Sequence, residues 1–135
     1  MKITCAAQTV RLAARRLTRR YEEALRPLNL TASQYTILTA LVSSGGLRQG
    51  MLGDLLGFEQ TTTTRLLATM AKRGLVIFEP DPNDARSKIV RASANGHAAY
   101  AEGHALWEAA QKETLNAVTP EEWAETKRVL SRLTS

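Results

Sequence analysis

The sequence contains a single cysteine, Cys5, among 135 residues, and it has no long run of apolar residues. One cysteine excludes a framework of disulfide bonds within the chain. A membrane-spanning helix needs about 20 consecutive, mainly apolar residues, and no segment approaches that length. The first residues lack the apolar core of a signal peptide. These absences predict a globular, cytoplasmic protein without a membrane partner, and residues 1–135 suffice for a single domain.

Side chains arranged for catalysis or metal binding are also scarce. The two histidines, His97 and His104, lie seven residues apart, so they would share one face of a helix, a pairing that could suggest a metal site. However, the sequence has no H-x-x-x-H pair, no cysteine cluster, no phosphate-binding loop and no paired nucleophile and base. We therefore expect no enzymatic activity, no metal site and no cofactor.

Positive charge is concentrated in the first two thirds of the chain, and the formal net charge is +5. Residues 1–35 hold seven basic side chains against two acidic ones, whereas residues 92–135 hold four against six. A basic region is typical of proteins that bind nucleic acids or other anionic surfaces, although a solvated basic face has the same composition.

Apolar residues recur with helical spacing in the first third of the chain. The pattern over residues 10–28 predicts a long helix. Thr31 and Gln34 have the spacing of a capping box, which predicts that a second helix begins there. The Ser-Ser-Gly-Gly segment at residues 43–46 should end it.

Residues 49–73 predict a helix-turn-helix motif. A short helix over residues 49–56 is followed by a glycine turn and by a second helix over residues 60–73. In DNA-binding proteins with this motif, the second helix enters the major groove. The leucines of the short helix are expected to face inward (Leu52, Leu55 and Leu56). Gly50 and Gly53 should soften that helix, because a helical glycine costs about 0.5–1 kcal/mol relative to alanine.

A β-hairpin and two terminal helices are expected after this motif. Strands over residues 75–78 and 88–91 flank a turn-forming segment at residues 80–84. Ser93 can cap the next helix, and a Thr-Pro pair starts the last one. The expected fold class is mainly α with a small β-hairpin wing, which is a winged helix-turn-helix.

Four consecutive threonines open the second helix of the motif. Threonine costs a helix up to about 0.7 kcal/mol per residue relative to alanine, so the run invites a functional explanation. Threonine can contact phosphates and thymine methyl groups, glutamine can pair with adenine, and arginine can pair with guanine. The residues expected to contact DNA are Gln60, Thr61, Thr62, Thr64 and Arg65. The threonines could instead be surface positions without a role, with Thr63 in place of a buried valine.

The tip of the predicted hairpin supplies further polar side chains, namely Arg86, Ser87 and Lys88. A guanidinium on a protruding loop suits the narrow and electronegative minor groove of DNA. A solvated charged turn is the alternative interpretation of the same residues.

The chain resembles the MarR family of transcriptional regulators over nearly its whole length. The resemblance is carried by Thr64-Arg65, by the segment Lys72-Arg73-Gly74-Leu75-Val76, by the wing pattern Asp84-x-Arg86-Ser87-Lys88 and by Gly96. Glu59 departs from the family, which often has a serine or aspartate cap at that position.

The resemblance implies a homodimer that binds double-stranded DNA, most often as a repressor. Residues 1–30 and 94–135 would form the dimerisation helices, and residues 31–93 would form the DNA-binding lobe. The helix over residues 60–73 would read the major groove, Arg86 would enter the minor groove, and Asp84 would help to fix the wing.

The resemblance also implies a small-molecule effector that loosens DNA binding. The usual pocket of the family lies between the dimerisation helices and the DNA-binding lobe. Arg11 or Arg15 could meet the carboxylate of a small aromatic or phenolic anion there, or they could form a solvated face or contact phosphates. Trp107 and Trp123 are expected to anchor the core or an interface.

Cys5 supports an alternative, a repressor that senses oxidants. Some members of the family use a cysteine near the start of the first helix, and a helix N-terminus followed by arginines favours the reactive thiolate. Thr9 stands where the hydroperoxide-sensing members have a tyrosine, and Cys5 could instead be a small apolar residue at the dimer interface. A further alternative is a winged-helix module that binds a protein.

Overall fold

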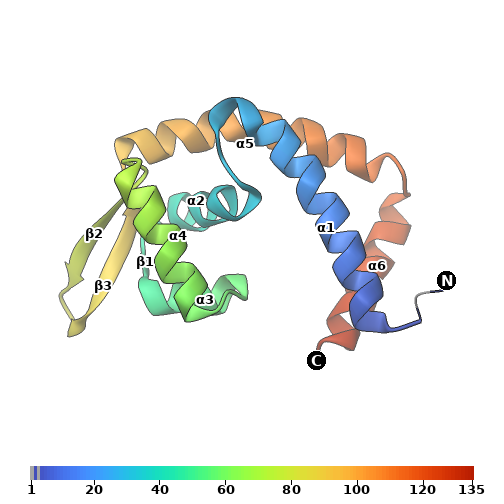
Figure 1. The fold of residues 1–135 in the computed structure, drawn as a ribbon, viewed down its shortest axis with the longest axis horizontal. Helices are drawn as coiled ribbons and strands as arrows, with labels where there is room; N and C mark the ends of the chain where they lie inside the picture. Colours follow the sequence, from blue (N-terminus) through green and yellow to red (C-terminus); the bar gives the residue numbers. More distant parts are fainter. Residues whose placement is uncertain (1, 3) are drawn as a thin grey trace.

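The computed structural model describes residues 2 and 4–135 and is mainly helical, with a three-stranded antiparallel sheet. Figure 1 shows α2, α3, α4 and the sheet gathered on one side of the molecule, with α1, α6 and both termini on the other. This arrangement confirms the expected fold class, a winged helix-turn-helix with additional terminal helices. The elements in chain order are α1 (Ala6–Leu25), η1 (Arg26–Leu28), α2 (Ala32–Ser44), β1 (Leu47–Arg48), α3 (Gln49–Leu56), α4 (Gln60–Lys72), β2 (Val76–Asp81), β3 (Asp84–Ala92), α5 (Ala94–Leu115) and α6 (Pro120–Leu133).

Side-chain caps set the starts of three helices. The Thr31 hydroxyl accepts a hydrogen bond from the Gln34 N–H at 3.1 Å, and the Gln34 side chain accepts one from the Thr31 N–H at 3.0 Å. Thr119 and Glu122 form the same reciprocal capping box at the start of α6, and Ser93 caps α5. Each cap satisfies a backbone N–H group that has no partner within its helix. The predicted starts of α2, α5 and α6 are therefore confirmed.

The hydrophobic core lies in the lobe and joins α2, α3, α4 and the sheet to the end of α1. Burying one large aliphatic side chain contributes about 1.5–3 kcal/mol relative to leaving it exposed. The core therefore fixes how α3 and α4 lie against the sheet. Its fully buried side chains include Leu25, Ile37, Leu38, Leu41, Leu52, Leu67, Met70 and Val90.

Gly53 is where α3 and α4 come closest. A Cβ atom on Gly53 would lie 3.0 Å from Oγ1 of Thr63 and 3.3 Å from the carbonyl oxygen of Phe58. Because α4 packs on this side of α3, the inward face of α3 turns toward Gly53, and Leu55 is 66% exposed. The prediction that Leu55 faces inward was wrong for this reason. Gly50 has open space around it, so only Gly53 has a packing role.

The sheet has the strand order β1-β3-β2, with Leu47 opposite Val90 at one edge and Val76 opposite Ala92 at the other. Both hairpin strands are longer than the apolar runs that predicted them, because backbone pairing continues into the polar residues of the wing. Only Pro82 and Asn83 form the turn. The other residues predicted for the turn, Pro80, Asp81 and Asp84, lie within the strands. The strand β1 was not predicted, because two residues are too few to show the alternation of apolar and polar side chains that marks a strand in a sequence.

The terminal helices leave apolar side chains uncovered. Val10 and Leu17 of α1 are about two fifths exposed, and Leu133 of α6 is 60% exposed. No residue of α6 is buried, although Trp123 and Leu130 are partly covered. An amphipathic helix normally buries its apolar stripe against another element, so these faces form an incomplete interface within one chain.

Candidate nucleic-acid interface

The start of α4 presents the side chains that were expected to contact DNA. Gln60, Thr61, Thr62, Thr64 and Arg65 are all exposed. The intervening Thr63 is only 2% exposed, and its hydroxyl donates to the carbonyl oxygen of Glu59 at 3.1 Å. Of the four threonines, Thr63 therefore packs against the lobe, and the other three form an exposed polar face. This arrangement suits a helix whose inner side contacts the lobe and whose outer side enters a DNA groove.

Gln49, at the start of α3, reaches the same polar face. Its Nε2 atom donates to the hydroxyl oxygen of Thr64 at 3.2 Å. Because the hydroxyl accepts this bond, its own proton remains available to a phosphate or base acceptor. This pairing could not be predicted from the sequence, since the contact depends on how α3 and α4 cross.

Arg86 and Lys88 project from β3 as exposed side chains, and Ser87 between them is partly buried. These residues follow the hairpin turn and do not form its tip, which corrects the prediction. Pro82 favours the second position of a tight turn, so the chain reverses before Asp84. The Asp84 side chain is exposed and accepts a hydrogen bond from the Arg86 N–H at 3.0 Å, which orders the start of β3.

Asp81 is the buried acid of the wing, at 5% exposure. One carboxylate oxygen accepts a hydrogen bond from the Asn83 N–H at 2.9 Å, and the other lies 2.6 Å from Nε of Arg48. Arg48 immediately precedes α3, so this ion pair joins the turn of the wing to the start of the helix-turn-helix. The sequence placed Asp81 in a turn cluster but did not reveal its partner 33 residues earlier.

An Arg48→Ala variant is expected to lower the free energy of unfolding by about 1 kcal/mol. When both partners of an ion pair are fully buried, removing one of them costs more than this. Here the Arg48 side chain is 45% exposed, so solvent screens part of its interaction with Asp81. Urea denaturation measures the change, with Arg86→Ala as an exposed arginine control on the same wing. Equal midpoints for the two variants would show that the ion pair contributes nothing.

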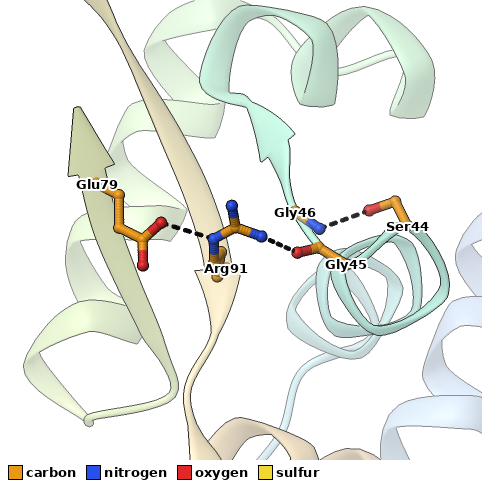
Figure 2. Close-up of polar contacts among 5 residues, drawn as sticks. All are labelled: Ser44, Gly45, Gly46, Glu79 and Arg91. Carbon is orange, nitrogen blue, oxygen red and sulfur yellow. Dashed lines mark hydrogen bonds and ion pairs between the residues drawn. The ribbon is translucent and has the colours of Figure 1, made fainter. Parts of the chain in front are cut away.

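Arg91 ties the base of the wing to the end of α2 (Figure 2). Its Nε atom donates to the Glu79 carboxylate at 2.7 Å, and its Nη1 atom donates to the carbonyl oxygen of Gly45. Gly46 lies against the guanidinium with φ +141°, and a Cβ there would come within 2.8 Å of Nη1. The Gly46 N–H donates to the Ser44 hydroxyl at 3.2 Å. The hairpin is thus held at its base as well as at its turn.

Arg73 holds the far end of α4. Its Nη1 atom donates to the carbonyl oxygen of Asn29 at 2.7 Å and to the Gln34 side chain at 3.2 Å. Its Nη2 atom donates to the carbonyl oxygen of Leu28 at 3.3 Å. Asn29 has a left-handed backbone, with φ 53°. One guanidinium therefore connects the end of α4 to the junction between α1 and α2.

Four aromatic rings from α2 and α5 form a cluster, and Tyr21 of α1 stacks on one of them, Trp107. The ring centroids of Tyr35, Tyr100, His104 and Trp107 lie 5.8, 5.6, 6.0 and 6.1 Å apart in turn. Gly103 allows the close approach, because a Cβ there would lie 3.2 Å from the Tyr35 ring. Trp107 was expected to anchor the core or an interface, and in the structure it is half-buried and packs against the hydrophobic core through this cluster.

Two cavities flank the aromatic cluster and share Tyr35, Thr36 and Trp107. One, of about 440 Å³, opens between α2 and α5, and the other, of about 290 Å³, opens between α1 and α2. Arg11 and Arg15 are exposed on α1, and neither lines these two cavities. The fold thus brings aromatic groups, and not these arginines, to the space between the lobe and the terminal helices.

The histidines do not come together as a metal site. His104 lies between two partners, with Nδ1 3.2 Å from the Tyr35 hydroxyl and Nε2 3.2 Å from the Glu108 carboxylate, whereas His97 is exposed on α5. Within residues 2 and 4–135, no three His, Cys, Asp or Glu side chains gather closely enough to hold a metal ion. In the same residues, no helix combines the length and apolar character needed to cross a membrane.

Comparisons with known proteins agree with this geometry. A MarR family profile matches residues 28–87, from η1 to the wing. Transcriptional regulator HosA of Escherichia coli O111:H- is 31% identical over 94 residues, which is 70% of each chain. Regulators of this kind are not enzymes, in line with the expectation from the sequence.

Solved structures extend the likeness to almost the whole chain. The M. tuberculosis transcriptional regulator MOSR in complex with DNA is 35% identical, with a TM-score of 0.86 over 96% of this chain and 92% of that one. A mutant MarR from E. coli complexed with operator DNA shares the fold at 24% identity, with a TM-score of 0.89 over 96% and 93% of the two chains. The protein therefore belongs to the MarR family of winged helix-turn-helix transcriptional regulators.

Proposed function

We propose that this DNA-binding regulator is a homodimeric repressor that is released from its operator by a small aromatic ligand. The observation that carries the proposal is the polar, exposed start of α4 beside a basic wing anchored at its turn and its base. Rigid placement of both elements lets one protomer contact a major groove and the adjacent minor groove together. The related regulator MOSR has been solved in complex with DNA, which supports the same role here.

The uncovered faces of α1 and α6 support the homodimer. Each helix carries an apolar stripe that the rest of the chain leaves partly exposed. A second copy would cover these faces and set two α4 helices side by side, as a pseudo-palindromic operator requires. In this arrangement residues 1–30 and 94–135 serve dimerisation, and residues 31–93 contact the DNA.

The cavities beside the aromatic cluster support release by a ligand. They lie where the lobe meets α1 and α5, so an occupant would touch both the DNA-binding part and the terminal helices. A ligand that fits one relative orientation of these parts better than another shifts the population toward that orientation. Release follows if the favoured orientation places the two α4 helices at the wrong spacing for DNA.

The deciding experiment is a binding titration of the purified protein against a duplex from just upstream of its own gene, with a random duplex alongside. Both titrations are run at two salt concentrations, because release of counterions makes DNA binding strongly dependent on salt. Tight, salt-sensitive binding that prefers the upstream duplex is expected. Weak and equal binding to both would contradict the proposal and favour a winged-helix module that binds a protein.

An Arg86→Ala variant is expected to bind all duplexes about fivefold to tenfold more weakly, because the wing loses a cation that lies in or near the minor groove. The salt dependence of binding should also become shallower, since fewer counterions are released. Fluorescence anisotropy at several salt concentrations measures both effects. Lys72→Ala, an exposed cation at the far end of α4, is the control. Unchanged affinity in Arg86→Ala would remove the wing from the interface.

A Cys5→Ser variant tests release by oxidants. Cys5 is exposed just before α1, and Thr9 donates its hydroxyl to the Cys5 carbonyl oxygen at 3.1 Å, so the thiol faces solvent near the helix start. If Cys5 is the sensor, wild-type protein loses operator binding in peroxide and the serine variant keeps it. Our proposal of a ligand-released repressor predicts equal binding by the two proteins in peroxide.

A further inference from the structure

The larger cavity beside the aromatic cluster is mainly apolar. It holds about 440 Å³ and is lined by the ring quartet together with Ala40 and Leu56. This volume lies within the range of sites for small organic molecules. Planar rings stack favourably on aromatic side chains, so a flat aromatic molecule suits the lining.

The ionisable groups of this lining are Tyr35, Tyr100 and His104, and the His104 imidazole is paired with the Glu108 carboxylate. Among the described residues that line the cavity there is neither lysine nor arginine. The hydroxyl of Thr36 donates to the Ala32 carbonyl oxygen, and that of Thr39 donates to the Tyr35 carbonyl oxygen, each at 2.9 Å. These two protons are therefore already engaged by the backbone, whereas the third hydroxyl of the lining, that of Ser43, can donate a hydrogen bond but carries no charge.

A carboxylate lies beside the cluster. Glu108 lies 3.2 Å from Nε2 of His104, and the other ring nitrogen lies 3.2 Å from the Tyr35 hydroxyl. Burial raises the pKa of Tyr35, and the nearby Tyr100 and Glu108 raise it further. Additional negative charge is thus disfavoured beside the Tyr35 ring.

We infer that the cavity between α2 and α5 takes a flat aromatic ligand without negative charge, either neutral or cationic, and rejects carboxylates. An anion would lose its hydration there and gain no counter-charge, which is costly. A cation would gain the ring faces as partners, and the exposed Glu108 carboxylate behind His104 would add a weaker attraction that solvent partly screens. This inference rests on the proposed function only in treating the cavity as the effector site.

Three probes of matched size test the inference, namely phenyltrimethylammonium, benzamide and benzoate. A Trp123→Phe background leaves Trp107 as the only tryptophan, so its fluorescence reports occupancy of the cavity it lines. Benzoate is expected to bind about tenfold more weakly than benzamide, because burying a charge without a partner costs at least this much. Phenyltrimethylammonium is expected to bind at least as tightly as benzamide.

A charge variant sharpens the test. Glu108→Gln should weaken phenyltrimethylammonium several-fold and leave benzamide unchanged, whereas Glu113→Gln, on the exposed part of α5, should change neither. Binding of benzoate as tightly as benzamide would overturn the inference, and so would the absence of quenching by all three probes at millimolar concentration.

An operator titration in parallel separates this inference from the proposed function. If the probes bind in the expected order but DNA stays bound, the cavity is a binding site of the inferred kind and its role in release is wrong. If benzoate releases the DNA without quenching Trp107, release by a ligand holds and the inferred site is wrong.

Discussion

An Arg65→Ala variant is expected to bind the operator about tenfold to a hundredfold more weakly than the wild-type protein. Arg65 is exposed in the second turn of α4, beside the polar side chains of Thr61, Thr62 and Thr64. One bidentate contact between arginine and guanine is worth about 1–3 kcal/mol of discrimination. The loss should therefore be concentrated at one or two base pairs, where operator substitutions will no longer matter to the variant.

The matched control for this prediction is Lys72→Ala. Lys72 is an exposed cation at the opposite end of the same helix, so its removal lowers the charge equally without touching the polar face. Anisotropy titrations with operator and random duplexes give the comparison. Equal losses on both duplexes in Arg65→Ala would mean that Arg65 contacts phosphates only.

A Gly96→Ala variant is expected to lose at least about 3 kcal/mol of folding free energy. A Cβ atom on Gly96 would lie 2.1 Å from the carbonyl oxygen of Leu75, which belongs to the backbone and has no flexible end to move aside. Overpacking in a well-ordered region costs about 1–3 kcal/mol and occasionally more. Here α5 would have to shift away from β2 or unwind its first turn.

Urea denaturation or thermal unfolding measures this loss, and Gly50→Ala provides the control. Gly50 is also helical, but nothing lies within 4 Å of a Cβ placed there, so alanine should be neutral or stabilise by up to about 1 kcal/mol. Comparable stability of the Gly96→Ala and wild-type proteins would contradict the contact between α5 and the chain before β2.

Local signals predicted the local structure well. The capping pair Thr31 and Gln34 marked the start of α2, and Gly57 ends α3 with φ +70°, as its position after Leu56 indicated. The exposed face of α4 was also predicted from the sequence. The buried positions of this helix, among them Thr63, recur with helical periodicity, so the positions between them face outward. Patterns of this kind depend on neighbours within one or two turns.

Contacts between distant segments could not be read in the same way. Asp81 and Arg48 meet across the sheet, and the aromatic cluster joins α2 to a helix about 65 residues later. Leu55 was misplaced for the same reason, since the crossing of α3 and α4 at Gly53 decides which side of α3 is covered. Arg11 and Arg15 share a helix with the cavity-lining Leu17 but point elsewhere.

The guanidinium of Arg73 has a mechanical consequence for the homodimeric repressor that we propose. Because it joins the end of α4 to the carbonyl groups of Leu28 and Asn29, a displacement of this segment after α1 would be passed on to α4, which would then act as a lever arm. In a homodimer, such a displacement would change the separation of the two α4 helices. Operator half-sites repeat about every 34 Å, so such a lever can turn DNA binding off without altering any residue that contacts DNA.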